Sequence, residues 1–108
     1  AHYSFLKAAN VLGIGLNNVI KVQTDARGRM IPQALESAIA HSLQIDKTPF
    51  FIAATAGTTV LGAFDPLPEL AQIAQKYHLW FHIDGSWGGA VLLSDRYRHF
   101  LAGSDQAD

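Results

Sequence analysis

The chain has 108 residues, of which 49% are hydrophobic and 16% charged, a composition that suits a folded domain or part of one and excludes a disordered tail. Its formal net charge of −1 leaves no basic stripe for nucleic acid or an anionic membrane surface, and no apolar run reaches the roughly 20 residues that a membrane-spanning helix needs. Cysteine is absent, which excludes disulfides and thiolate metal sites, so the cytoplasm is the expected compartment.

The first half of the chain alternates between helical and extended patterns. A helix is predicted from Tyr3 to Leu12 with Gly13 as its stop, and the β-branched stretch from Asn18 to Thr24 predicts a strand. Asp25 to Arg29 has the composition of a turn. A second helix is predicted from Pro32 to Gln44, since proline suits the first turn of a helix. The residues expected to face the core are Phe5, Ala8, Ala9 and Leu12 in the first helix and Leu35, Ala38, Ile39 and Ser42 in the second.

The second half predicts two strands joined by a helix. Phe50 to Ala56 and Leu79 to Asp84 are short, nearly continuous apolar runs, typical of strands buried on both faces of a parallel sheet. Between them lie a loop from Gly57 to Pro68 and a helix from Glu69 to His78. The inner face of that helix is expected to carry Leu70, Ile73, Ala74 and Tyr77. Strand, helix and strand in this order predict an α/β fold with a mostly parallel sheet and flanking helices.

Polar residues stand at the end of both predicted strands. Thr55 closes the first and is followed by Gly57-Thr58-Thr59, while Asp84 closes the second and is followed by Gly85-Ser86-Trp87-Gly88-Gly89. Ligands of open α/β sheets bind outside the carboxyl ends of the strands. Neighbouring parallel strands would therefore place these two ends side by side at a ligand site.

Asp84 is the most informative single residue. A carboxylate that ends an apolar strand needs a partner if it is to stay charged. A protonated pyridine nitrogen is one such partner, and catalysis by pyridoxal phosphate depends on that proton because the ring must accept the electrons of the broken bond. Position alone also allows Asp84 to cap the next helix or to bind a backbone amide.

Histidines and glycines provide the other candidates. The imidazole of His2 can stack flat on an aromatic cofactor ring, although the position also suits an exposed residue at the start of a helix. His78 and His82 are four residues apart, but the end of a helix falls between them, so no metal site is predicted. Gly88-Gly89 predicts close backbone packing or a tight turn.

Four stretches carry a resemblance to a known family: His2-Tyr3-Ser4, Leu12 to Gly15, Ala54 to Pro66, and His82 to Gly89. In this order they resemble the group II pyridoxal phosphate-dependent amino-acid decarboxylases, which include glutamate, cysteine sulfinate, diaminobutyrate and aromatic amino-acid decarboxylases. The stretch from Gly57 to Pro66 is most similar to the glutamate and cysteine sulfinate members.

The resemblance implies roles for four residues. His2 matches the histidine that stacks on the cofactor ring near the substrate, and Asp84 matches the aspartate that pairs with the pyridine nitrogen. Thr55 matches a threonine that lines the cofactor pocket. Ser86 takes the place of a small residue, usually alanine, on the opposite ring face. The family commonly has Asp-Ala-Ala-Trp where this chain has Asp84-Gly85-Ser86-Trp87, and both replacements stay small enough for the ring to fit.

The resemblance also implies a fold, an activity and partners. The fold would be part of the large domain of a fold type I, aspartate-aminotransferase-like enzyme, with residues 1–108 forming a piece that is incomplete at both ends. The parent would be a homodimer that binds pyridoxal 5'-phosphate and removes the α-carboxylate of an acidic or related amino acid, giving an amine and CO2.

The family's cofactor-binding lysine is expected just after Asp108, and its phosphate-binding residues before His2, so the segment alone is expected to be inactive. Two alternatives stay open. One is another fold type I enzyme, such as an aminotransferase or a lyase; the other is an α/β module without a cofactor.

Overall fold

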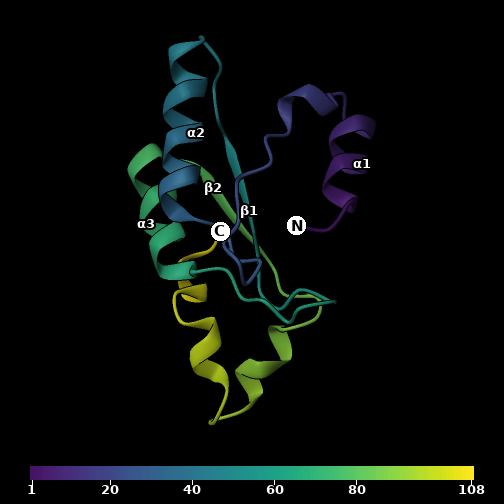
Figure 1. Cartoon of the computed structure of the whole chain (residues 1–108), viewed down its shortest axis with the longest axis vertical. Helices are drawn as coiled ribbons and strands as arrows, with labels where there is room; N and C mark the ends of the chain where they lie inside the picture. Colours follow the sequence, from purple (N-terminus) through teal and green to yellow (C-terminus); the bar gives the residue numbers. More distant parts are fainter.

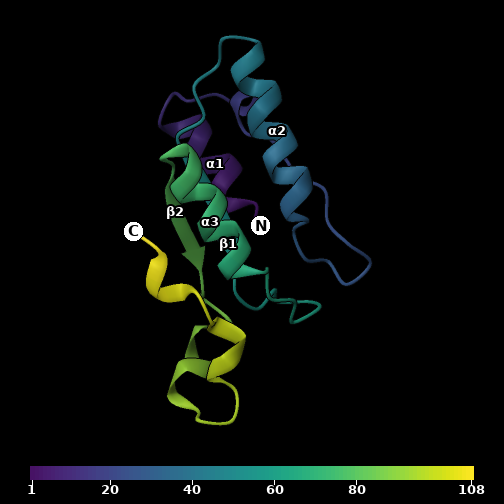
Figure 2. The same ribbon diagram turned by 90° about the vertical axis from the view of Figure 1, so that its left-hand side faces the viewer.

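The computed structural model describes all 108 residues and centres on a two-stranded parallel sheet (Figure 1). Strands β1 (Phe51–Thr55) and β2 (Trp80–Asp84) pair along their whole length. Helices α2 (Pro32–Gln44) and α3 (Leu67–Tyr77) lie on one side of the sheet, and α1 (Ser4–Val11) lies on the other (Figures 1 and 2). Four 3-10 helices complete the chain: η1 (Leu16–Asn18), η2 (Gly89–Leu93), η3 (Arg98–Leu101) and η4 (Ser104–Gln106). The predicted α/β architecture with a parallel sheet is confirmed.

The two faces of the sheet differ in what covers them. Successive side chains of a strand point to opposite faces, so the register divides the strands into two sets. The core face comprises Ile52, Ala54, Phe81 and Ile83. The open face comprises Phe51, Ala53, Thr55, Trp80, His82 and Asp84. On the core face Phe81 is 1% exposed, whereas Trp80 on the open face is 55% exposed. The expectation that both strands are buried on both faces is therefore wrong for the open face, where only α1 approaches the sheet (Figure 1).

The hydrophobic core lies between the core face and the helices α2 and α3. Phe81, Leu67 and Leu70 are its largest fully buried side chains. Each fully buried side chain of this size contributes roughly 1.5–3 kcal/mol relative to an exposed one. The other members of the cluster are Leu35, Ile39, Ile52, Ala54, Ala56, Ala71, Ile73, Ala74, Leu79 and Leu101.

The helix predictions are confirmed for α2 and α3. Leu35, Ile39 and Ser42 of α2 are buried, and so are three of the four inner residues expected in α3, with Tyr77 half-buried. Helix α3 begins at Leu67 and not at Glu69 as predicted. Pro68, which was expected to end the loop, fits within the first turn of the helix. None of the helices is both long and apolar enough to span a membrane.

Helix α1 has nearly the predicted bounds, but its expected inner face is wrong. Ala9 is buried and Phe5 is half-buried, whereas Ala8 is exposed and Leu12 is 73% exposed. Apolar periodicity marks the face that a helix can bury, and within this chain little packs against that face of α1.

The strand predicted from Asn18 to Thr24 is also wrong. Its first residue ends η1, and Thr24 makes only an isolated antiparallel bridge with Met30. A β-branched stretch becomes a strand only where a neighbour completes the hydrogen-bond ladder, and no such neighbour lies beside this one. The predicted turn that follows is confirmed: the Asp25 carboxylate accepts hydrogen bonds from the amides of Arg27 at 2.8 Å and Arg29 at 3.0 Å.

Candidate functional site

The carboxyl ends of β1 and β2 meet, as expected of neighbouring parallel strands. Thr55 and Asp84 are register partners, and the amide of Ala56 donates a hydrogen bond to the Asp84 carbonyl at 2.8 Å. Both side chains belong to the open face. The sheet therefore brings together the two residues that the sequence singled out at the strand ends.

Two glycines let the loops after these strands touch. A Cβ on Gly88 would stand 2.3 Å from the carbonyl oxygen of Ala56, and a Cβ on Gly57 would stand 2.7 Å from the Cα of Gly88. Gly57 also has a φ of +84°, which side chains rarely adopt. The prediction of close backbone packing holds for Gly88, whereas a Cβ on Gly89 would meet nothing within 4 Å.

The Asp84 carboxylate is half-buried and uses one oxygen within the chain. Its Oδ1 accepts hydrogen bonds from the hydroxyl of Ser86 at 2.6 Å and from the Ser86 amide at 3.1 Å, while no protein group donates to Oδ2. The Ser86 hydroxyl is the main reason that the pKa of Asp84 lies below its usual value. Burial opposes this shift, whereas the Ser86 amide and the charges of His82 and His2 add to it. Asp84 is thus an ionised group with one free acceptor.

Thr55 is buried, and its hydroxyl oxygen has no hydrogen-bond partner. An unpaired buried hydroxyl costs about 1–3 kcal/mol, so such atoms in folded proteins call for an explanation. Because this one lies at the end of β1 beside Asp84, a polar ligand at the strand ends would satisfy it. Thr55, Asp84 and the glycine contact together form the candidate site.

Asp65 supports the site and was given no role by sequence reasoning. Its Oδ1 accepts a hydrogen bond from the Met30 amide at 2.6 Å, and its Oδ2 accepts one from the Thr55 amide at 2.8 Å. The carboxylate therefore ties the end of β1 to Met30, which follows the turn before α2. No local sequence signal pointed to this role, because the two amides lie 35 and 10 residues away along the chain.

His2 lies before α1 on the open side of the sheet. Its Nδ1 accepts a hydrogen bond from the Ser4 amide at 3.2 Å, and its ring centroid is 4.2 Å from that of Tyr3. The imidazole is exposed, and its charge is near enough to help lower the pKa of Asp84. The fold thus brings His2 into the neighbourhood of Asp84, while its stacking on a ligand ring stays a prediction.

His82 belongs to an aromatic group on the open face. Its ring stacks on Phe51 with centroids 5.7 Å apart and meets Phe5 of α1 edge-on at the same distance. Nowhere in the chain do three or more His, Asp or Glu side chains gather so that they could hold a metal ion. His82 therefore acts in this structure through packing and through its charge near Asp84.

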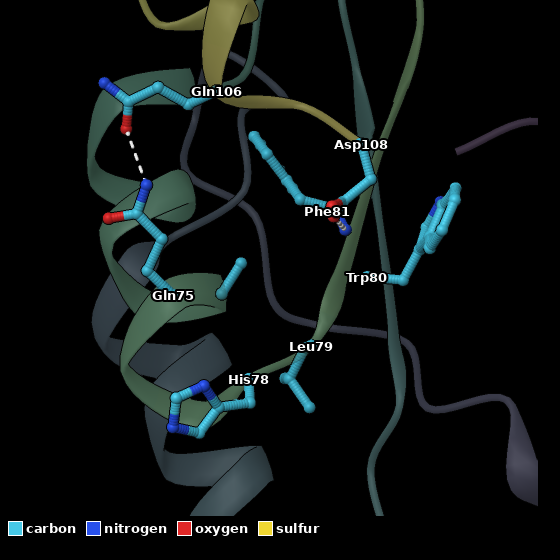
Figure 3. Close-up of a pocket in the computed structure, with 8 residues that line it drawn as sticks. Gln75, His78, Leu79, Trp80, Phe81, Gln106 and Asp108 are labelled. Carbon is cyan, nitrogen blue, oxygen red and sulfur yellow. Dashed lines mark hydrogen bonds between the residues drawn. The ribbon is translucent and has the colours of Figure 1, made fainter.

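A depression of about 560 Å³ lies at the other end of β2, between α3 and the last residues of the chain (Figure 3). Two pairs of its polar groups already bond to each other: Gln75 donates to Gln106 at 3.3 Å, and the Phe81 amide donates to Asp108 at 2.8 Å (Figure 3). It opens where β2 begins, whereas ligands of parallel sheets bind where strands end. The strand ends at Thr55 and Asp84 are therefore the better candidate.

Comparison with known proteins is consistent with this geometry. A family model described as "Pyridoxal-dependent decarboxylase conserved domain" matches residues 1–108. The chain is 54% identical over 107 residues to the acidic amino acid decarboxylase GADL1 of Xenopus tropicalis, an overlap that covers 99% of this chain and 21% of that protein.

Solved structures agree over the whole chain. The crystal structure of mouse CSAD in apo form superposes with a TM-score of 0.99 at 51% identity, covering 100% of this chain and 23% of that one. The glutamate decarboxylase domain of diaminobutyrate-pyruvate transaminase and L-2,4-diaminobutyrate decarboxylase from Vibrio parahaemolyticus gives a TM-score of 0.95 at 37% identity, over 99% of this chain and 23% of that one. These matches confirm the expected fold type I, and the chain spans about a fifth of the length of the proteins it matches.

Proposed function

This chain belongs to the pyridoxal-dependent decarboxylase family, and on that premise we propose that it is part of a pyridoxal phosphate-dependent carboxy-lyase that removes the α-carboxylate of an amino acid as CO2. The observation that carries the proposal is the register pair of Thr55 and Asp84, which puts an ionised carboxylate beside an unpaired buried hydroxyl at the strand ends. The family match counts against an α/β module without a cofactor.

The residues at the strand ends have the chemistry that such a cofactor needs. Asp84 keeps Oδ2 free for a cationic partner, and the hydroxyl of Thr55 is free for a polar atom. We assign Asp84 to the pyridine nitrogen, Thr55 to the wall of the pocket, and His2 and Ser86 to opposite ring faces. Bound pyridoxal phosphate supplies an electron sink for the bond that breaks at the substrate's α-carbon.

The chain's own contribution is electrostatic and geometric. The Asp84 carboxylate would hold the proton on the ring nitrogen, because an ionised acid nearby favours the charged form of its partner. Its lowered pKa keeps that carboxylate ionised throughout the neutral range. His2 would restrict the tilt of the ring. Decarboxylation requires the scissile bond to stand perpendicular to the ring plane, so this restriction favours the reaction.

Substrate, assembly and compartment belong to the same proposal. We propose an acidic amino acid or a related one as substrate, since similar proteins are named acidic amino acid decarboxylase and cysteine sulfinic acid decarboxylase. Residues 1–108 would form part of the large cofactor-binding domain. The parent would be a homodimer in the cytoplasm.

The test is an Asp84→Ala variant of the full-length parent, with Asp95→Ala as control because the Asp95 side chain is 96% exposed. CO2 release from glutamate, aspartate, cysteine sulfinate and 2,4-diaminobutyrate would be measured together with keto-acid formation. We expect Asp84→Ala to keep the far-ultraviolet circular dichroism of the parent and to lose at least about 100-fold in kcat/KM.

Two results would contradict the proposal. Full decarboxylation by Asp84→Ala would remove Asp84 from the mechanism. Keto acid as the main product of the unmodified parent, without CO2, would identify an aminotransferase of the same fold instead.

A further inference from the structure

Ser86 makes both hydrogen bonds that the carboxylate of Asp84, the candidate catalytic group, accepts. Its hydroxyl lies 2.6 Å from Asp84 Oδ1, and its amide lies 3.1 Å from the same oxygen. Hydrogen bonds from a hydroxyl to a carboxylate are about twice as strong as those between neutral groups. Both donors come from one residue and converge on one oxygen, which leaves the other oxygen without a donor.

We propose that Ser86 is a positioning residue whose hydroxyl holds the Asp84 carboxylate by Oδ1 and thereby reserves Oδ2 for a cationic ring nitrogen. This rests on the proposed function, in which Asp84 receives such a nitrogen. A serine that only filled space on a ring face would need no hydrogen bond to Asp84. The observed contact gives its hydroxyl a defined partner and the carboxylate a defined orientation.

Ser86 supplies the hydrogen bonds that the Asp84 carboxylate accepts from within the chain. The other charged groups that act on Asp84 are His82 on β2 and His2 before α1, and both favour the ionised form without a hydrogen bond to it. Asp65, on the loop after β1, directs both of its oxygens to the amides of Met30 and Thr55 instead. Without the Ser86 hydroxyl, only one backbone amide would hold the Asp84 carboxylate.

The hydroxyl also has a consequence for pH dependence. A carboxyl group whose pKa is lowered stays ionised further into acid, so binding that needs its charge persists until the pH falls through that lowered pKa. Removing the Ser86 hydroxyl removes the largest cause of the lowering. Binding of a cationic nitrogen should then be lost at a higher pH than in the unmodified protein.

The experiment measures the dissociation constant of pyridoxal phosphate for the cofactor-free, full-length parent across a pH series, by fluorescence titration. The variants are Ser86→Ala and Ser86→Gly, which both lack the hydroxyl, with Ser37→Ala as matched control. Ser37 is an exposed serine of α2 whose side chain makes no hydrogen bond. Asp84→Ala is included as the reference for complete loss of the carboxylate.

We expect both Ser86 variants to lose binding at higher pH than the unmodified parent and to bind about tenfold more weakly on the acid side, since one charge-assisted hydrogen bond is lost. The dissociation constants of Ser37→Ala should equal those of the unmodified parent at every pH. If Asp84→Ala weakens binding while the Ser86 variants bind pyridoxal phosphate like the parent at every pH, the positioning role is wrong and the function of Asp84 stands. If Asp84→Ala also binds like the parent, the proposed function of Asp84 fails, and the role of Ser86 fails with it.

Discussion

The core face and the open face of the β1–β2 sheet are made from alternate residues of the same two strands, yet they differ in burial and in the groups that they present. Ile52, Ala54 and Phe81 on the core face are at most 4% exposed and pack against α2 and α3. The open face ends in Thr55 and Asp84, an unpaired hydroxyl and a carboxylate with a free oxygen. One face of each strand therefore stabilises the fold, while the other face presents polar groups that are free to bind a ligand.

The largest effect on stability is expected at the centre of the core face. Phe81→Ala removes a fully buried ring and should lower the free energy of unfolding of the parent by about 3–5 kcal/mol. Leu43→Ala is the control, because Leu43 is 50% exposed on α2, and it should cost less than about 1 kcal/mol. Denaturant titration followed by circular dichroism measures both variants.

The same variant, Phe81→Ala, is expected to leave ligand binding nearly unchanged. The dissociation constant of pyridoxal phosphate for the folded fraction should stay within about threefold of the unmodified value, since the ring lies on the core face, opposite to the side chains of Thr55 and Asp84. A large loss of affinity with little loss of stability would show that the core face and the open face are not separable.

An intermediate effect is expected at Asp65, which ties the end of β1 to the turn before α2. Asp65→Asn keeps one acceptor for the amides of Met30 and Thr55 but turns an NH2 group toward the other amide. The loss of one hydrogen bond to a charged group should cost about 1–3 kcal/mol and loosen the end of β1. Thermal unfolding of the parent measures the cost, with Asp105→Asn as control because Asp105 is exposed and makes no side-chain hydrogen bond. Equal thermal unfolding midpoints for Asp65→Asn and Asp105→Asn would show that the hydrogen bonds of Asp65 do not stabilise the fold.

The smallest loss of stability, paired with a loss of binding, is expected at Thr55. Thr55→Val removes an unpaired buried hydroxyl and keeps the shape of the side chain, so the cofactor-free parent should be as stable as before or gain up to about 1–3 kcal/mol. If the hydroxyl meets the ligand, the same change should weaken pyridoxal phosphate binding about tenfold. Thr48→Val is the control, since Thr48 is an exposed threonine that precedes the opposite end of β1. A destabilised variant with unchanged affinity would place Thr55 among the structural residues instead.

Sequence patterns predicted the elements whose partners lie within the chain. Periodicity identified the buried faces of α2 and α3, because both faces belong to a hydrophobic core that the same chain completes. The apolar runs that end in Thr55 and Asp84 predicted two parallel strands with adjacent ends, and the register confirms it. The patterns predicted more buried residues on α1 than the structure has, and a strand from Asn18 to Thr24 that does not form. Periodicity and β-branching indicate which residues a segment can bury or pair, but not whether a neighbouring element is present.

The amino-acid sequence by itself determined the class of fold, the order of α1, α2, β1, α3 and β2, and which polar residues would stand at the strand ends. Tertiary structure alone decided that Asp65 reaches the amides of Met30 and Thr55, that Gly88 touches the carbonyl of Ala56, and that Ser86 gives its hydroxyl to Asp84. The physical reason is that sequence patterns have a short range, whereas hydrogen bonds depend on direction. Periodicity and propensity act over a few neighbouring residues, whereas a hydrogen bond depends on the positions and angles of two atoms that only the folded chain brings together.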